Sequence, residues 1–246
     1  MIRVRNLSKV FKLPHARKKT LFHNIVSLAS ERYEYEELYA LRDISFDVGD
    51  GEFVGVIGRN GSGKSTLLRI LARIYQPTSG SVEIRDEIYP LLELGVGFQM
   101  DFTVRDNIYL YGSLLGRSRK EMDRHFPAIM EFSELERFAD ARLEKLSTGM
   151  QMRLGFAIAI QSTAPIMLVD EVLAVGDSVF SEKCRRVFWN FKQTGKTILL
   201  VSHDMGTIRE YCNRVLLMDG GRLIGEGQPD AMIGLYHDLV NAPAES

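Results

Sequence analysis

The stretch "GRNGSGKS", Gly58–Ser65, stands between an apolar run, "EFVGVI", and a helical one, "KSTLLRILARI". It matches G-x-x-x-x-G-K-[ST] at every fixed position. Glycines at these positions let backbone N–H groups turn inward around phosphate oxygens, and the helix that follows adds the positive end of its dipole. The stretch therefore predicts a phosphate-binding loop between a buried strand and a helix.

The side chains of this loop carry separate expectations. Lys64 is expected to reach the β- and γ-phosphates of a nucleotide, and the Ser65 hydroxyl is expected to ligate Mg²⁺. A Gly-rich turn that binds no nucleotide is the alternative, and the flanking strand and helix make it the weaker one. The residues expected around the phosphates are Gly58, Arg59, Asn60, Gly61, Ser62, Gly63, Lys64, Ser65 and Thr66.

Composition narrows the class of protein. The 246 residues carry a formal net charge of -1, so the chain lacks the basic footprint of a nucleic-acid-binding protein. Cys184 and Cys212 are too few for a disulfide framework and fit a reducing compartment. The N-terminus shows no signal-peptide pattern, and no apolar run approaches the roughly 20 residues that span a bilayer. We expect a cytosolic protein without a nucleic-acid partner.

Further apolar runs flank the loop on both sides. The runs "IMLVD", "TILLVS" and "RVLLMD" alternate with helical stretches, which predicts a parallel α/β sheet. Two short runs near the N-terminus, "IRVRNL" and "ISFDV", predict a small β region over about residues 1–50. A charged helical pattern predicts a helical subdomain over about residues 100–160. We expect all of these parts to form a single domain over residues 1–246.

Residues 12–38 form an insertion that is too long for a hairpin turn. The segment begins basic and ends acidic, and its middle, "TLFHNIVSLAS", has apolar residues at helical spacing. We expect an amphipathic helix there.

Three polar residues lie at or just after the ends of two predicted strands. Asp170 ends "IMLVD", at the sheet edge where ligands bind in open α/β folds, and it is expected to hold Mg²⁺. Glu171 is next and is a candidate general base for an attacking water. His203 in "VSHD" is a candidate to contact the γ-phosphate and orient that water. A plain acidic strand end and a structural histidine are the alternatives.

The stretch "LEKLSTGMQMRLGF", Leu143–Phe156, opens a predicted helix with Ser-Thr-Gly. One explanation is an ordinary helix cap by Ser147. The other is an uncrowded helix N-terminus that meets an anion. The local sequence leaves both open.

Four motifs now stand in order, namely Gly58–Ser65, Leu146–Met150, Asp170–Glu171 and His203. Together they resemble the nucleotide-binding subunits of ABC transporters, with "LSTGM" in place of the usual L-S-G-G-Q. The resemblance covers nearly the whole chain. It implies a P-loop ATPase fold, ATP and Mg²⁺ as ligands, and hydrolysis by Lys64, Glu171 and His203.

The resemblance also implies a homodimer in the ATP-bound state. The helix after "LSTGM" would point its N-terminus at ATP bound to the other subunit. The residues implied in that contact are Ser147, Thr148, Gly149 and Met150, and Asp177 matches a dimer contact of the family. Val172 departs from the family, which usually has proline there.

"LSTGM", "DEVLAVGD" and "LLELGVGF" resemble one branch, the ATPases that export O-antigen, capsule or teichoic acid. The implied function is to power export through a separate integral membrane permease, which handles the polysaccharide, from the cytoplasmic face of the inner (cell) membrane. We expect no C-terminal carbohydrate-binding domain. The insertion helix would pack against the permease or the bilayer, or alternatively on its own domain.

Two positions of the family pattern stay ambiguous. The permease-sensing glutamine has two candidates, Glu93 in "LLELG" and Gln99 in "GFQ". The adenine-stacking aromatic is Phe11, by its position from the N-terminus, or Tyr39, by its distance to the next strand, and we favour Phe11.

Other functions are less well supported. A transporter ATPase for a lipid or a drug is the main alternative. Soluble ABC ATPases that act on DNA or ribosomes usually carry two cassettes or a long coiled coil, and neither pattern occurs here. A regulatory module that holds ATP without turnover is disfavoured by the intact Lys64, Asp170, Glu171 and His203.

Overall fold

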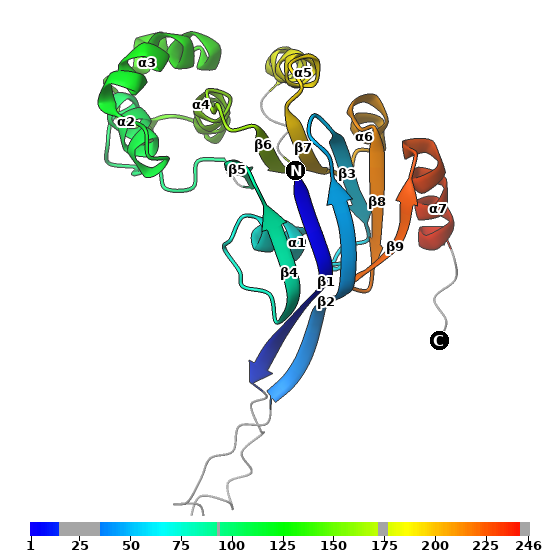
Figure 1. The fold of residues 1–246 in the computed structure, drawn as a ribbon. Coiled ribbons are helices and arrows are strands. Elements are labelled where there is room, and N and C mark those ends of the chain that lie inside the picture. Colours follow the sequence, from blue (N-terminus) through cyan, green and yellow to red (C-terminus); the bar gives the residue numbers. More distant parts are fainter. Residues whose placement is uncertain (15–34, 93, 172–176, 242–246) are drawn as a thin grey trace, which may run out of the picture.

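The computed structural model describes residues 1–14, 35–92, 94–171 and 177–241. Two sheets and a set of helices build the molecule (Figure 1). The larger sheet has the strand order β5-β6-β7-β3-β8-β9, in which neighbours are parallel except for the antiparallel β9. Its strands are β3 (Phe53–Gly58), β5 (Ile88–Leu91), β6 (Ile166–Asp170), β7 (Thr197–Val201), β8 (Arg214–Asp219) and β9 (Arg222–Gly227).

The central strands are buried on both faces, which explains their nearly continuous apolar sequences. Alternate residues of one strand enter different cores, because successive side chains of a strand point to opposite faces. In β6, Met167 and Val169 pack with α5 (Ser178–Gln193) and α6 (Met205–Tyr211). Ile166 and Leu168 pack on the other face, with α1 (Lys64–Leu71). The predicted parallel sheet is confirmed.

The second sheet is antiparallel, with the order β2-β1-β4, and α1 lies between it and the central sheet (Figure 1). Its strands are β1 (Ile2–Pro14), β2 (Tyr35–Val48) and β4 (Ser79–Ile84). The predicted ends of the insertion are wrong on both sides, because β1 and β2 stay paired as far as Pro14 and Tyr35. Lys12 stands opposite Glu37, a cross-strand pair of opposite charges that favours this longer ladder. The predicted insertion helix falls within residues 15–34, outside the described residues.

Three helices form a subdomain with a core of its own. They are α2 (Val104–Leu114), α3 (Arg119–Ser133) and α4 (Thr148–Ala159), with the short turns η1 (Glu136–Phe138) and η2 (Leu143–Lys145) between α3 and α4. At the other end of the sheet, α7 (Pro229–Asn241) packs beside β8, β9 and α6 (Figure 1). Within the described residues, every helix is too short or too polar to cross a membrane.

A buried asparagine holds the loop that leads into the helical subdomain. The side chain of Asn107 is fully buried, and its Oδ1 accepts the backbone N–H of Gln99 at 2.7 Å. Its Nδ2 donates to the carbonyl oxygens of Gln99 and Thr103, both at 2.9 Å. A buried amide with this many partners fixes the loop because each broken bond would leave a polar group unsatisfied.

We predict that Asn107→Ala lowers the free energy of unfolding by about 2–3 kcal/mol, because three backbone groups lose a buried partner. Chemical denaturation of the full chain measures the change. The exposed Asn190 provides the control, since Asn190→Ala is expected to cost less than about 0.5 kcal/mol. Equal effects of the two variants would show that the Asn107 network does not stabilise the fold.

Candidate functional site

The phosphate loop closes tightly against its neighbours. Gly58 (φ 153°) and Gly63 (φ 102°) have positive φ, a conformation that side chains disfavour. A Cβ on Gly63 would lie 2.6 Å from the carbonyl oxygen of Ala40, and one on Gly58 would clash with the backbone of Met218. By contrast, Gly61 (φ 77°) faces open space. Packing and backbone conformation together therefore require glycine at both ends of the loop.

Lys64 lies over this loop. It is buried, and its Nζ donates to the carbonyl oxygens of Gly58 at 2.7 Å and Arg59 at 2.9 Å. Burial lowers the pKa of Lys64, while the carboxylates of Glu171 and Asp170 act in the opposite direction. Charged phosphate oxygens are stronger partners for an ammonium group than neutral carbonyls. Among the described residues, the hydrogen bonds of this partly desolvated cation go to two neutral carbonyl oxygens.

Ser65 and Asp170 form the expected cation-binding pair. The Ser65 hydroxyl is hydrogen-bonded to the Asp170 carboxylate, and burial raises the pKa of that carboxyl. A hydroxyl and a carboxylate are hard oxygen donors of the kind that Mg²⁺ takes together with substrate phosphates. The pair could therefore contribute two ligands to a Mg²⁺ ion whose other ligands are phosphate oxygens and water.

Glu171 and His203 meet just beyond the ends of β6 and β7. Glu171 Oε1 lies 2.7 Å from His203 Nε2, and each side chain is about half exposed. The backbone of Glu171 is left-handed (φ 54°), an unusual conformation for glutamate, and its N–H donates to Val201 at 3.0 Å. The main chain is thereby fixed where it turns the carboxylate toward the histidine. A carboxylate in this position can accept a proton from water.

The start of α4 has features of both a capped helix and an accessible anion-binding N-terminus. Ser147 is the cap, and its Oγ accepts the N–H of Met150 at 3.3 Å. Ser147 and Thr148 are exposed, and nothing but the Ser147 hydroxyl approaches a Cβ placed on Gly149. Gln151, which the sequence analysis missed, donates to the carbonyls of Leu143 and Leu146 and fixes the turn before the helix. The helix N-terminus is therefore capped, fixed and accessible.

Asp177 joins the N-terminus of α5 to the helical subdomain. It caps α5 by accepting the N–H of Phe180 at 3.0 Å, which lowers the pKa of its carboxyl. Arg153 of α4 pairs with Asp177 and also with Glu134, at 2.9 Å. Sequence reasoning missed Arg153, which ties the start of α5 to the helical subdomain.

Of the two candidates for the permease-sensing residue, Gln99 lies within the described residues. Glu93 lies outside the described residues. Gln99 has an exposed side chain, while its backbone is fixed by Asn107. The segment that holds both residues follows β5, whose last residue, Leu91, pairs with Val169 directly before Asp170. This segment therefore begins at the same sheet edge as Asp170.

The two candidate adenine-stacking rings lie in different surroundings. The Phe11 ring is half-buried and packs edge-on against Tyr75, with centroids 5.6 Å apart. The Tyr39 ring is covered by the Arg42 guanidinium at 4.7 Å, and its hydroxyl donates to Glu37 at 3.1 Å.

A strand, a Gly-rich loop and a helix thus carry a lysine, and neighbouring strands add Asp170, Glu171 and His203. This arrangement defines a P-loop nucleotide-hydrolysing protein. The family model described as "ABC transporter" matches residues 41–174, more than half of the chain. The chain belongs to the ABC transporter family, and it is an ATPase of that family. The predicted resemblance, fold class and ATPase activity are confirmed.

Curated relatives share much of this sequence. An O-antigen export system ATP-binding protein, RfbB of Klebsiella pneumoniae, is 41% identical over 98% of both chains. RfbB of Myxococcus xanthus is 44% identical over 84% of this chain and 48% of its own length. A teichoic acids export ATP-binding protein, TagH of Lactococcus lactis, is 39% identical over 97% of this chain and 51% of its own length. The chain spans about half the length of these last two relatives.

Solved structures show the same cassette. A dimeric ATP-binding cassette in a post-hydrolysis state, bound to ADP and Pi, is 26% identical and has a TM-score of 0.73. It matches 93% of this chain and 99% of its own. The likeness therefore extends over the whole fold and is not confined to the phosphate loop.

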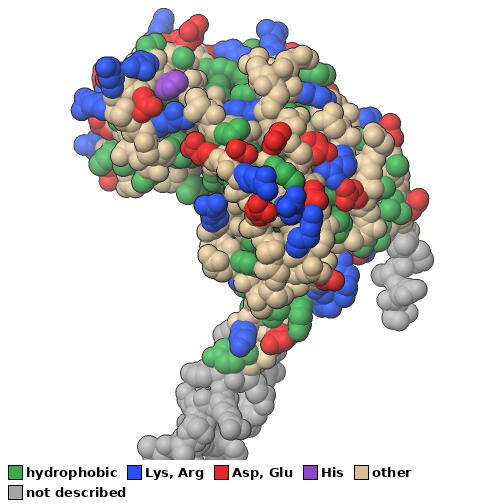
Figure 2. Space-filling view, viewed as in Figure 1, with side chains coloured by type: hydrophobic (Ala, Val, Ile, Leu, Met, Phe, Trp, Pro, Cys, Tyr) green, Lys and Arg blue, Asp and Glu red, His purple; other side chains and the backbone are tan. Residues whose placement is uncertain are grey.

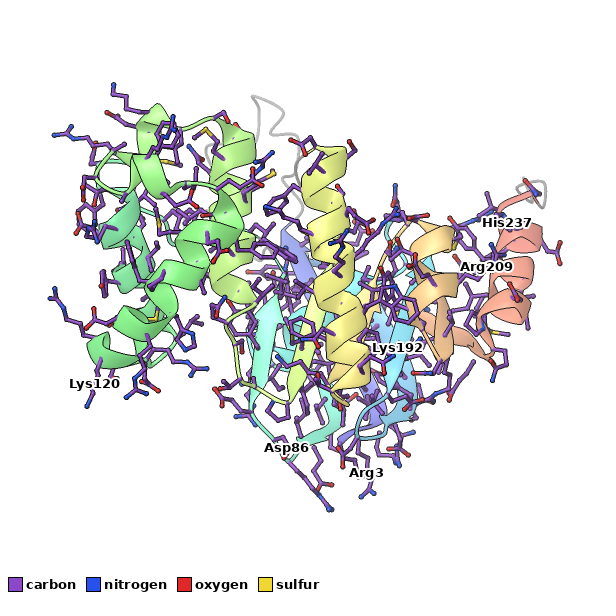
Figure 3. All side chains as sticks on the ribbon, turned by 90° about the horizontal axis from the view of Figure 1, so that it is seen from above. Arg3, Asp86, Lys120, Lys192, Arg209 and His237 are labelled. Atoms are coloured by element: carbon purple, nitrogen blue, oxygen red, sulfur yellow. The ribbon has the colours of Figure 1, made fainter. Side chains whose placement is uncertain are left out.

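We predict that Lys64→Ala weakens the binding of MgATP by about 10- to 100-fold, because a charged hydrogen-bond donor to phosphate is lost. Equilibrium titration with a fluorescent ATP analogue measures the affinity. Lys120, an exposed lysine of the helical subdomain (Figure 3), provides the matched control, and Lys120→Ala should bind as the parent does. Unchanged affinity in Lys64→Ala would contradict the assignment of the loop.

Proposed function

We propose that this ATPase powers the export of a cell-surface polysaccharide, such as lipid-linked O-antigen, capsule or teichoic acid, through a separate membrane permease. The observation that carries the proposal is the 41% identity, over 98% of both chains, to an O-antigen export ATP-binding protein. The teichoic acids export relative supports the same class of cargo. In this proposal the polysaccharide is handled by the permease, and the chain supplies the energy.

The residues of the site take separate roles in hydrolysis. Lys64 binds the β- and γ-phosphates, and Ser65 and Asp170 hold Mg²⁺, which neutralises developing charge on the phosphates when bound. Glu171 takes a proton from the attacking water, and His203 holds the Glu171 carboxylate and orients that water. The remaining loop residues, Gly58–Gly63 and Thr66, surround the phosphates. Because Glu171 and His203 are about half exposed, water reaches them freely.

A head-to-tail homodimer would complete each site. The start of α4 offers exposed hydroxyl groups and an uncrowded backbone, and the cassette solved with ADP and Pi is dimeric. We place Ser147, Thr148, Gly149 and Met150 against the γ-phosphate bound by the other subunit. In this arrangement Asp177 contacts the partner from the N-terminus of α5. Two ATP molecules then lie between the subunits, and the subunits separate after hydrolysis.

The permease partner follows from the export-system names of the relatives. We place the chain on the cytoplasmic face of the inner (cell) membrane, peripherally bound through the permease. Glu93 or Gln99 would sense the permease, since their segment begins beside Asp170. Figure 2 shows basic and acidic side chains interspersed over the visible face, a distribution that offers no continuous track for a nucleic acid.

We assign adenine stacking to Phe11. Each ring has a cation near one face, Lys9 Nζ at 5.0 Å from the Phe11 centroid and the Arg42 guanidinium at 4.7 Å from the Tyr39 centroid. Phe11 is in addition held by packing against Tyr75, and a ring held in this way suits stacking on a base.

Export of another cargo, such as a lipid or a drug, is the second candidate. An ABC transporter protein of Aeromonas salmonicida, AbcA, is 36% identical over 98% of this chain and 77% of its own length, and its name specifies no cargo. Because this name gives no cargo, the relative does not favour a polysaccharide over a lipid or a drug.

We predict that deletion of the gene removes a surface polysaccharide and leaves its lipid-linked form inside the cell, because synthesis continues without export. Immunoblotting of surface glycan and mass spectrometry of the lipid-linked pool measure both effects. A plasmid copy should restore export, and a Lys64→Ala copy should not. Unchanged surface glycan would remove the polysaccharide assignment and leave an ABC ATPase for another cargo.

A further inference from the structure

Arg59, the second residue of the phosphate loop, makes a contact far along the chain. Its Nη2 donates to the carbonyl oxygen of Leu239 at 2.6 Å, across 180 residues of sequence. Leu239 lies in the last turn of α7. The side chain of a phosphate-loop residue is thus engaged by the C-terminal end of a helix.

This end of α7 is well suited to a guanidinium group. The last four carbonyls of a helix lack partners inside the helix, and they form the negative end of its dipole. An arginine N–H that donates to such a carbonyl makes a charge-assisted hydrogen bond. The last turn of α7 also has no basic side chain of its own. Arg59 therefore supplies the cation that this helix end lacks.

The two ends of α7 are held differently. At its start, Asp230 pairs with Arg209 of α6 at 2.6 Å, and Figure 3 shows Arg209 beside the helix, with His237 further along it. Ile233 is the buried anchor in the first half. Near the C-terminal end, Val240 is 44% exposed, so apolar packing holds the last turn weakly. The contact with Arg59 therefore matters most at that end.

The backbone of the same residue holds the catalytic lysine. The carbonyl oxygen of Arg59 accepts Lys64 Nζ at 2.9 Å and the N–H of Ser62 at 3.2 Å. Phosphate oxygens would draw Lys64 away from this carbonyl, since they are its stronger partners. One residue therefore contacts the phosphate-binding lysine through its backbone and the end of α7 through its side chain.

We infer that Arg59 is a positioning residue that couples the docking of the last turn of α7 to nucleotide binding in the phosphate loop. The inference rests on the proposed nucleotide site. A docked α7 holds the loop in the conformation that binds phosphate. Because coupling is reciprocal, bound nucleotide must in turn strengthen the docking of α7. Docking of the last turn of α7 thereby changes the affinity of the phosphate loop for nucleotide.

Isothermal titration with MgADP tests the first half of this coupling, because ADP binding needs neither hydrolysis nor a permease. Arg59→Ala should bind MgADP about 3- to 10-fold more weakly than the parent. Arg59→Lys should bind nearly as the parent does, since an ammonium group can also donate to one carbonyl. The control is Arg186→Ala, which removes an exposed arginine of α5 and should leave affinity unchanged. Unchanged affinity in Arg59→Ala would overturn the inference.

Hydrogen exchange over residues 229–241 tests the second half. MgADP should slow exchange in this segment in the parent and in Arg59→Lys, and should have no such effect in Arg59→Ala. If Arg59→Ala binds weakly while MgADP leaves exchange in the parent unchanged, Arg59 acts on the nucleotide directly and the coupling is refuted. A parent chain that does not bind MgADP at all would instead refute the nucleotide site itself.

Discussion

The close packing of the phosphate loop is the constraint on which the rest of the structure depends. A side chain on Gly63 would meet the carbonyl of Ala40 in β2, and one on Gly58 would meet the backbone of Met218 in β8. The loop is therefore enclosed by strands from both sheets, and its backbone has few alternatives. This enclosure fixes the first turn of α1, which carries Lys64 and Ser65. The antiparallel sheet is thus part of the nucleotide site and not merely an addition to it.

The topology of the central sheet then brings the remaining groups to the loop. β6 and β7 are parallel neighbours, so Asp170, Glu171 and His203 gather at one edge. Two of these groups are held in states that cost energy. Burial raises the pKa of Asp170, and Glu171 adopts a left-handed backbone, which costs of order 1 kcal/mol or more. The first cost fits a carboxylate that binds a cation, and the second turns the Glu171 side chain toward His203.

Sequence patterns were sufficient for those features that are each determined by a single short segment of the chain. The loop, the strand that ends at Asp170 and the start of α4 each follow from local patterns of glycine, apolar runs and capping residues. Contacts between distant segments could not be predicted in this way. Asn107, Arg153 and the contact from Arg59 to Leu239 depend on how separate elements pack. The outer part of the paired strands β1 and β2 was missed because it is exposed and lacks a buried face, although Lys12 opposite Glu37 was a signal for it.

The central claim is that Glu171 activates water in a site shared by two subunits. Sedimentation velocity of Glu171→Gln with MgATP, together with a phosphate-release assay, tests it most directly. The amide keeps the shape of the side chain but cannot accept the proton, so the account predicts a stable ATP-bound dimer with hydrolysis reduced by about 100-fold or more. A Glu171→Gln protein that stays monomeric with MgATP, or that hydrolyses ATP as fast as the parent, would contradict the account.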